Sequence, residues 1–229
     1  MIAFFCVFLY DRPRTDETQT GTFDLDGTLL DTLDDLSEAV NHALRLRGFP
    51  LHTRAEYMTM VGHGVRNLVL QALPAEKQAD DALVDAALSD FKDYYTAHID
   101  VHTHPYPGMQ ELVYRLDREG VSLAIASNKF QEGTDYLVGK FFPGVPFVAV
   151  LGNRPGYPLK PDPEIVGEAL RRSGVRPEDA VLVGDSATDM KTAENGGIAS
   201  IAVSWGYRPM KGTPGLTVVE TAEELNGIL

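Results

Sequence analysis

From about Pro105 onward the chain alternates between short apolar runs and amphipathic stretches. The apolar runs have the length of strands and lie at 121–127, 147–152, 180–184, 200–204 and 216–220. The stretches with apolar residues at helical spacing lie at 108–118, 131–140, 162–173, 190–195 and 221–229. Strands that alternate with helices are typical of a parallel sheet covered on both faces. The pattern therefore predicts an α/β fold with a Rossmann-like parallel sheet core.

Residues 32–104 show helical periodicity and no strand-like run. Thr32 with Asp35, and Thr53 with Glu56, have the spacing of capping boxes, which predicts two helix starts. This region therefore predicts an all-helical insert between the first and second strands of the core.

The insert includes one long helix, predicted over residues 75–97. We expect residues 1–31 and 105–229 to form the α/β core domain and residues 32–104 to form a helical cap domain.

The N-terminal segment, residues 1–20, is atypical for such a core. Residues 2–9 are apolar but too short to span a membrane, and they lack the basic start of a signal peptide. We expect a buried strand there, a polar loop over 11–22, and no membrane association. Because Gly21 weakens the run that leads to Phe23, three alternatives stay open. Residues 2–9 pack as a separate segment, the first strand is short, or the N-terminus itself is altered.

Composition narrows the classes of partner. The chain has 229 residues, 20 basic and 33 acidic, so its formal net charge is −13. An acidic surface repels phosphate backbones, which argues against nucleic-acid binding. Cys6 is the only cysteine, which excludes an intrachain disulfide and predicts a reducing, cytoplasmic location. Both a monomer and a homodimer remain compatible with the sequence.

Aspartates gather at the ends of two predicted strands. Asp24 and Asp26 are two residues apart, so an extended chain points both side chains the same way, and Gly27 permits a sharp turn after them. Asp185 directly follows another apolar strand, and Asp189 comes four residues later. The carboxyl ends of parallel strands meet in one crevice. Carboxylates that converge there repel one another without a cation, and their hard oxygens suit Mg²⁺.

Other polar residues follow the neighbouring strands. Ser127, Asn128 and Lys129 come after an apolar run and offer a hydroxyl and an amide as donors. Lys160 lies in a proline-interrupted loop, from which its ammonium could balance anionic charge in the crevice.

Several other sites fail on their spacing. A calcium-binding loop starting at the first aspartate would have Leu29 where glycine is needed and Asp35 where glutamate is needed. Gly62 and Gly64 begin a dinucleotide-binding fingerprint, but Asn67 takes its last glycine position and no strand precedes it. The sequence also has no phosphate-binding GxxxxGK[ST] loop and no GxSxG nucleophile elbow.

Four motifs occur in order: DLDGT (24–28), SNK (127–129), LKPDP (159–163) and GDSATDM (184–190). Together they resemble the haloacid dehalogenase-like hydrolase superfamily. The helical insert after the first motif resembles the C1 cap of its phosphatase branch. The SNK motif, together with residues 151–163 and 61–68, is most similar to phosphoglycolate phosphatase-like members.

The resemblance implies a role for each motif residue. Asp24 would be the nucleophile and form an aspartyl phosphate. Asp26 would be the general acid and then the general base. Ser127 and the backbone amides near Gly27 would hold phosphoryl oxygens, and Lys160 would offset the negative charge. Asn128 is expected to contact the substrate from the same motif.

The resemblance also implies a Mg²⁺ ion. Its ligands would be the Asp24 carboxylate, the Asp26 backbone carbonyl and Asp185. Asp189 would bind the metal through water or orient Lys160.

Two groups in the cap are weaker candidates. Arg66 could grip an anionic end of the substrate. His98, His102 and His104 cluster near the second crossing between cap and core, where a zinc site and plain surface histidines are both open.

These expectations add up to a Mg²⁺-dependent phosphatase for a small phosphorylated metabolite, with 2-phosphoglycolate as the first choice. The enzymatic alternatives are a pyrophosphatase, a sugar-phosphate phosphatase or a β-phosphoglucomutase-like phosphotransferase. The alternative from another class is a non-catalytic protein that binds phosphate esters and has lost turnover.

Overall fold

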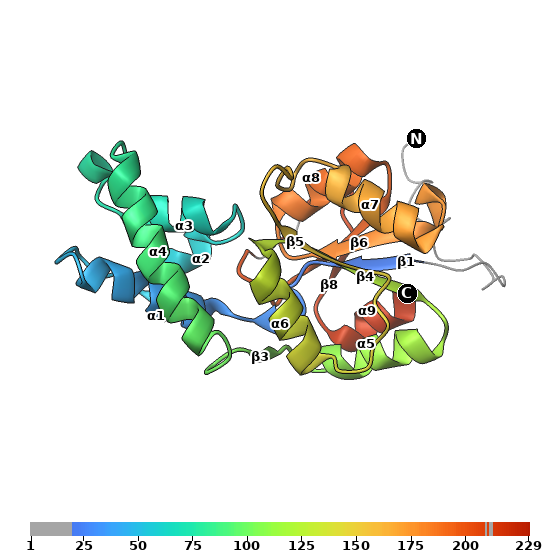
Figure 1. The fold of residues 1–229 in the computed structure, drawn as a ribbon. Coiled ribbons are helices and arrows are strands. Elements are labelled where there is room, and N and C mark those ends of the chain that lie inside the picture. The colour runs from blue at the N-terminus through green and yellow to red at the C-terminus, as the bar shows by residue number, and fades with distance from the viewer. Residues whose placement is uncertain (1–19, 209, 211–212) are drawn as a thin grey trace.

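The structure is a computed structural model that describes residues 20–208, 210 and 213–229. In this part of the chain the main sheet has six strands in the order β5-β4-β1-β6-β7-β8, and all neighbouring strands are parallel. The strands are β1 (Thr20–Phe23), β4 (Ser122–Phe130), β5 (Ala149–Asn153), β6 (Ala180–Gly184), β7 (Ala199–Val203) and β8 (Val218–Val219). The predicted Rossmann-like parallel sheet is thereby confirmed (Figure 1).

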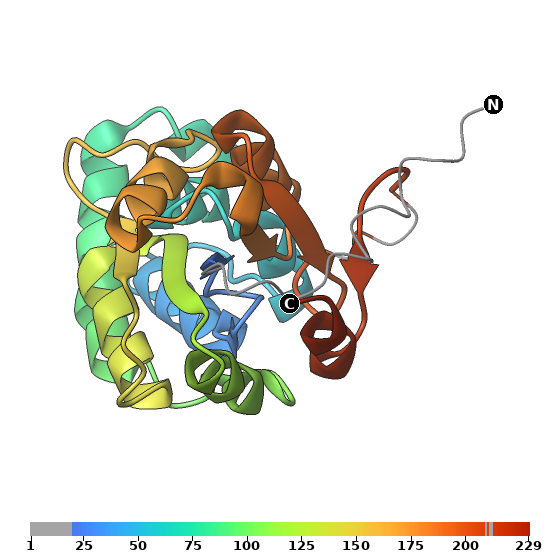
Figure 2. The same cartoon turned by 90° about the vertical axis from the view of Figure 1, so that its right-hand side faces the viewer.

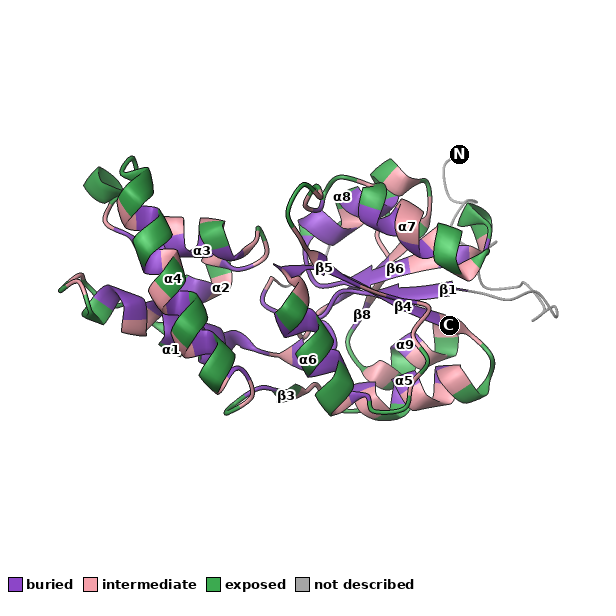
Figure 3. Cartoon of the chain, viewed as in Figure 1, coloured by how far each residue is buried: buried purple, intermediate pink, exposed green. Residues whose placement is uncertain are grey.

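Helices cover both faces of this sheet. One face carries α5 (Met109–Arg118), α6 (Gln131–Phe141) and α9 (Ala222–Ile228), and the other carries α7 (Glu164–Ser173) and α8 (Ala187–Gly196), with the short turn η2 (Pro177–Asp179) before β6 (Figure 1). Successive residues of β4 serve opposite faces, because Leu123 and Ile125 join one apolar cluster while Ala124 and Ala126 join the other. This explains why β4 reads as a continuous apolar run (Figure 3).

The first strand is short, as one of the alternatives predicted. Thr20, Gly21, Thr22 and Phe23 are all buried between β4 and β6, so the expected loop over 11–22 is wrong for its last three residues. A Cβ atom on Gly21 would lie 3.0 Å from the Phe23 ring, which accounts for the glycine there. The apolar segment 2–9 lies outside the described residues.

The region between the first and second core strands is helical. It holds α1 (Leu33–Arg45), α2 (Arg54–Met60), α3 (Val65–Ala72), the short turn η1 (Ala75–Lys77) and α4 (Asp81–His98). We call residues 32–104 the cap. Figure 2 looks along the strands from the end opposite the cap, so that the cap helices lie behind the sheet. The division of the chain into two domains at these boundaries stays a prediction.

Two short strands join the cap to the core. β2 (Leu30–Asp31) and β3 (His104–Pro105) pair antiparallel, with Leu30 opposite Pro105 and Asp31 opposite His104. The chain therefore enters and leaves the cap side by side.

Two details of the cap differ from the sequence pattern. The long helix begins at Asp81 instead of residue 75, because the Asp80 side chain accepts a hydrogen bond from the Leu83 amide and starts a new helix there. The Thr53–Glu56 capping box of α2 is confirmed.

The capping box predicted at Thr32 and Asp35 is wrong. The Thr32 hydroxyl makes no cap bond and donates instead to Asp26. The Asp35 carboxylate accepts bonds from the backbone of His102 and Thr103, so it ties the start of α1 to the segment that returns to the core.

Among the described residues, no helix has the length and apolar character needed to cross a lipid bilayer.

Candidate active site

The predicted aspartates come together at the carboxyl ends of two adjacent strands. Asp24 follows β1, Asp185 follows β6, and Asp189 lies in the first turn of α8. One carboxylate oxygen from each of the three lies within 4.8 Å of the others, and all three residues are buried. In the described part of the chain this is the one acidic cluster with such spacing.

Glycines make room for this cluster. Gly27 has a φ of +84°, and a Cβ atom there would lie 2.6 Å from Asp185 Oδ2. A Cβ atom on Gly206 would also collide with the Asp185 side chain. The Gly27 amide donates to the Leu30 carbonyl (2.9 Å). The structure therefore places Gly27 in a tight turn that closely approaches Asp185, and phosphate binding by other backbone amides near it stays a prediction.

Lys160 lies inside the acidic cluster. Its Nζ is 3.0 Å from Asp24 Oδ1 and 2.6 Å from Asp189 Oδ1, and it donates to the Ala126 carbonyl at 2.8 Å. Burial alone would favour the neutral amine, but the Asp189 and Asp24 carboxylates outweigh it and raise the pKa of Lys160. The lysine is a fixed, buried positive charge beside Asp24.

One lysine does not balance three aspartates. Burial raises the pKa of Asp24 to about 7, the charges of Asp189 and Asp26 add to this, and Lys160 opposes it. Burial, followed by the charges of Asp189 and Asp24, raises the pKa of Asp185 to about 8. Both shifts have the same physical meaning, which is an excess of buried negative charge. A divalent cation with hard oxygen ligands fits this donor set.

Asp189 differs from Asp24 and Asp185 in how much of its carboxylate the protein already uses. Both oxygens of Asp189 are used by the protein, one by Lys160 and the other by the backbone and hydroxyl of Ser186. Asp24 Oδ2 has no protein donor among the described residues. Asp185 Oδ2 accepts a bond from the Tyr207 amide, so Asp24 Oδ2 and Asp185 Oδ1 are the oxygens of these two residues without a protein donor among the described residues, while Asp189 is ion-paired with Lys160.

Asp26 lies on the other side of the site. Its Oδ1 accepts a bond from the Thr32 hydroxyl (2.7 Å) and lies 3.3 Å from Lys129 Nζ. The Thr32 hydroxyl is in turn 3.1 Å from the Tyr207 hydroxyl. These contacts hold the Asp26 carboxyl group through Oδ1, and Asp26 lines the cavity.

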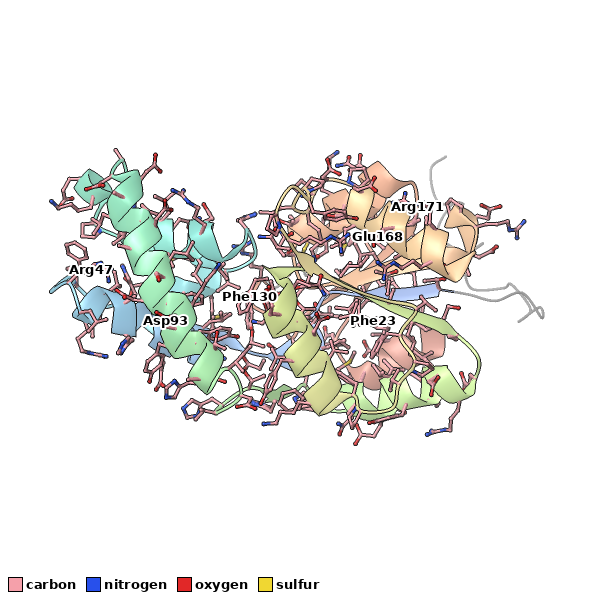
Figure 4. The ribbon with its side chains drawn as sticks, viewed as in Figure 1. Phe23, Arg47, Asp93, Phe130, Glu168 and Arg171 are labelled. Carbon is pink, nitrogen blue, oxygen red and sulfur yellow. The ribbon has the colours of Figure 1, made fainter. Side chains whose placement is uncertain are left out.

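Lys129 connects this side of the site to the cap. Its Nζ is 2.6 Å from the Tyr95 hydroxyl of α4 and lies 4.6 Å from the centre of the Tyr95 ring. The ring of Phe130 packs edge-on against Tyr95 at the junction of cap and core (Figure 4). Burial lowers the pKa of Lys129, with the Asp26 carboxylate opposing it.

The SNK motif lies within β4 instead of after it. The pairing of β4 with β5 shifts between Ala126 and Phe130, and a bulge of this kind turns successive side chains in new directions. Ser127 and Asn128 both line the cavity. The Asn128 amide group donates to the carbonyls of Gly62 and Lys160 and accepts from the Lys160 amide, so both its hydrogens are used. Asn128 therefore positions the loop that carries Lys160 and the loop of the cap at residues 61–64, which we call the cap loop. Ser127 is free to donate to a ligand.

The structure does not bring the cap candidates to the site. Arg66 pairs with Asp81 and Asp85 on α4 and is not among the cavity-lining residues. His98 bonds the Tyr94 carbonyl, and His104 bonds the His102 carbonyl. The three histidines do not form a metal cluster within the described residues.

Thr32, Tyr95, Tyr207 and Arg208 are site residues that the sequence reasoning missed. Tyr207 reaches Thr32 across 175 positions, and Arg208 reaches the cap loop across 147. Only their closeness to a strand end after β7 could have drawn attention to the last two.

Comparisons with known proteins show the family of this chain. The family described as haloacid dehalogenase-like hydrolase matches residues 22–203, and the chain belongs to that family. A phosphoglycolate phosphatase from Mesorhizobium japonicum is 37% identical over 186 residues, covering 81% of this chain and 82% of that one. Phosphoglycolate phosphatase 1 from Pseudomonas aeruginosa is 32% identical and covers 89% of this chain and 76% of its own length.

Solved structures show the same fold. A predicted phosphoglycolate phosphatase from Haemophilus somnus superimposes with a TM-score of 0.82 at 26% identity, covering 93% of this chain and 98% of that one. CbbY from Rhodobacter sphaeroides, solved with phosphate, gives a TM-score of 0.76 at 22% identity and covers 91% of this chain and 96% of its own. At that identity the second likeness concerns the fold alone.

Proposed function

We propose that this protein is a Mg²⁺-dependent phosphatase that hydrolyses a small phosphate monoester, 2-phosphoglycolate, through an aspartyl phosphate on Asp24. The observation that carries the proposal is the ion-paired Asp24–Lys160 contact (3.0 Å) inside a buried acidic cluster at the end of β1. The phosphoglycolate phosphatases among its relatives supply the choice of ester.

In the first step Asp24 attacks phosphorus and the alkoxide leaves. Lys160 Nζ, held by Asp189 and the Ala126 carbonyl, keeps a positive charge next to the attacking carboxylate. That charge reduces the repulsion between Asp24 and an anionic phosphate. The Ser127 hydroxyl faces the same cavity and supplies a donor for a phosphoryl oxygen.

Asp26 transfers the protons. It donates a proton to the departing alkoxide in the first step and accepts one from the attacking water in the second. Thr32 and Lys129 hold its Oδ1, so the carboxyl group keeps one orientation in both steps.

Asp24 and Asp185 would hold Mg²⁺, with the Asp26 carbonyl as the third protein ligand expected from the family. When bound, the ion supplies the positive charge that the cluster lacks and screens the phosphate from the carboxylates. Asp189 does not bind the ion in this proposal, because Lys160 and Ser186 occupy both of its oxygens.

Phosphate release from 2-phosphoglycolate, with and without Mg²⁺, tests the proposal. The panel also contains pyrophosphate, glucose 6-phosphate and β-glucose 1-phosphate. We expect Mg²⁺-dependent release that favours 2-phosphoglycolate.

Other results would change specific parts of the proposal. Preferred release from another ester would keep the mechanism and replace the substrate. Conversion of β-glucose 1-phosphate into glucose 6-phosphate without free phosphate would identify a phosphotransferase. Tight binding of every ester without release, in a folded sample containing Mg²⁺, would identify a non-catalytic binding protein.

A further inference from the structure

The cavity above the acidic cluster has an apolar roof. The cap residues that line it are Leu36, Val61, Gly62, Gly64, Val65 and Leu68, none of which carries a charge. Under the proposed function the leaving group is glycolate, whose carboxylate must lie away from the phosphate and toward this roof. Burying a carboxylate against apolar groups is costly unless a cation pairs with it. The cation therefore has to come from the core.

Two cationic side chains line the cavity, Lys129 and Arg208. Lys129 Nζ is already held by Asp26 and the Tyr95 hydroxyl, and its side chain is 1% exposed. The three hydrogens of Lys160 Nζ are used in contacts with Asp24, Asp189 and the Ala126 carbonyl. Each lysine thus has a partner that the mechanism requires.

Arg208 has a different set of contacts. Its Nη2 donates to the carbonyls of Thr59 (2.8 Å) and Val61 (2.6 Å) at the end of α2. In the described part of the chain, no carboxylate pairs with its guanidinium group. A guanidinium has five N–H donors, so Nε and Nη1 keep donors for a ligand.

Gly62 lies directly beside the Arg208 guanidinium group. Gly62 has a φ of +113°, and a Cβ atom there would lie 3.4 Å from Arg208 Nη1. A side chain at this position would press against the guanidinium group at Nη1. His63 adds no competing charge, because burial and then the Arg208 charge lower the pKa of its imidazole.

We propose that Arg208 binds the carboxylate of the leaving group and so selects phosphate esters that carry a second anionic group. The carbonyls of Thr59 and Val61 hold Nη2 and fix the direction of the guanidinium, and Arg208 lines the cavity with Nε and Nη1 without a protein acceptor among the described residues. This inference rests on the proposed phosphatase function and adds the residue that determines its specificity.

Arg66 provides a matched control. Like Arg208 it is an arginine next to the cap loop, and the sequence alone favoured it as the anion-binding residue. Its guanidinium is spent on Asp81 and Asp85 at the surface of the cap. Variants of the two arginines therefore distinguish between the residue that the sequence predicts, Arg66, and the residue that the structure favours, Arg208.

The test compares two esters of the same length, 2-phosphoglycolate and ethyl phosphate, of which only the first has a carboxylate. The measured quantity is the ratio of their kcat/KM values. In R208Q we expect the ratio to fall about 10- to 100-fold, the range for losing a hydrogen bond to a charged group. In R66Q we expect the ratio of the wild type.

Three results would overturn the role of Arg208. They are unchanged kcat/KM values for both esters in R208Q, an equal loss of kcat/KM for both esters in R208Q, which would mean that Arg208 only fastens the cap, and a fall of the ratio in R66Q instead. R208K is the second variant and covers the case in which R208Q does not fold. Lysine keeps the charge but loses the simultaneous contacts to carbonyl and ligand, so its ratio should fall several-fold, and an unchanged ratio would contradict the proposal.

The wild type separates the two proposals. If it releases phosphate equally from both esters, the choice of 2-phosphoglycolate fails, and Arg208 has no selective role. If it favours 2-phosphoglycolate and R208Q keeps that preference, only the role of Arg208 fails.

Discussion

The two sides of the site are built from different parts of the chain. On the nucleophile side, Lys160 touches Asp24, Asp189 and the Ala126 carbonyl, all of which belong to the core. On the acid side, Lys129 touches Asp26 of the core and Tyr95 of the cap.

The difference lies in what each lysine depends on. The charge next to the nucleophile is fixed by the sheet and its loops, whatever the position of the cap. The orientation of the acid includes a contact with α4, as well as the bond from Thr32 at the start of the cap. Under the proposed mechanism the cation beside the nucleophile is therefore held by the core alone, whereas the orientation of the acid depends on both cap and core.

The largest expected effect is on the nucleophile itself. Asp24→Asn keeps the shape of the side chain and removes its negative charge, so kcat for 2-phosphoglycolate should fall by about 10⁴-fold or more. Steady-state phosphate release measures this loss. The variant should melt no lower than the wild type, because it removes a buried charge. Near-normal turnover would contradict the assignment of Asp24.

Lys160→Met comes next. It leaves Asp24 and Asp189 buried without a cation, so we expect kcat to fall by about 10²- to 10³-fold and the free energy of unfolding to fall by about 3 kcal/mol. Urea unfolding and phosphate release measure the two effects. Lys129→Met is the matched control. An equal loss of stability in both variants would contradict the difference between the nucleophile side and the acid side of the site.

The third prediction concerns pH and metal. Asp24 and Asp185 have folded pKa values near 7 and 8, above those of the unfolded chain, so protonation stabilises the fold. That contribution is complete below about pH 4 and is lost as pH rises to 8. The melting temperature of the metal-free protein should therefore fall between pH 5 and pH 8.

Mg²⁺ should reverse this loss. At about 100 times its dissociation constant it should raise the melting temperature at pH 8 by about 5–10 °C, and by less at pH 5, where protons compete with it. Differential scanning fluorimetry at both pH values, with Ca²⁺ and Na⁺ as comparisons, measures the shifts. An equal Mg²⁺ shift at pH 5 and pH 8 would argue against binding by these carboxylates.

Lys129→Met addresses the acid side. Loss of a charged hydrogen bond to Asp26 should lower kcat for 2-phosphoglycolate about 10- to 100-fold. p-Nitrophenyl phosphate needs little help from an acid, because its leaving group is stable as an anion, so its kcat should change much less. Lys160→Met should slow both esters alike, and a similar pattern in Lys129→Met would contradict the division of roles.

Tyr95→Phe has the smallest expected effect. It removes the hydroxyl that contacts Lys129 Nζ and keeps the aromatic ring, so kcat for 2-phosphoglycolate should fall about 3-fold. The variant tests whether the cap contributes to the orientation of the acid. A value of kcat equal to that of the wild type would confine this role to Lys129 and Thr32.

The sequence predicts the sheet and the acidic cluster well because both depend on local order. An apolar run ends, a carboxylate follows, and parallel strands bring such ends together. Asp24 and Asp185 directly follow strands in this way, and Asp26 comes two residues after Asp24. Asp35 shows why the roles of other residues cannot be predicted from the sequence. Its spacing from Thr32 fits a capping box, yet its carboxylate is taken by the backbone of His102 and Thr103, 67 and 68 positions away.

The same limit explains the choice of arginine. In the sequence Arg66 follows a glycine-rich loop of the cap and has no acidic neighbour, so the sequence favours it as a residue free to bind an anion. In the folded chain α4 packs beside it, and Asp81 and Asp85 pair with its guanidinium group. Arg208 follows β7 in a loop with no recognisable motif, and only the folded chain places it against the carbonyls of Thr59 and Val61. Contacts between distant segments have no signature in a single sequence.

The pairing of β2 with β3 has a consequence for how the molecule could change. Leu30 and Asp31 face Pro105 and His104 directly, so the whole helical insert begins and ends at one point of the core. An insert with adjacent ends imposes no span on the sheet, and its length can vary at little entropic cost to the rest of the chain. We therefore expect that the helices of a relative can be grafted between residues 31 and 104 to change specificity, provided that the graft keeps the contacts of Thr32 and Tyr95 on the acid side.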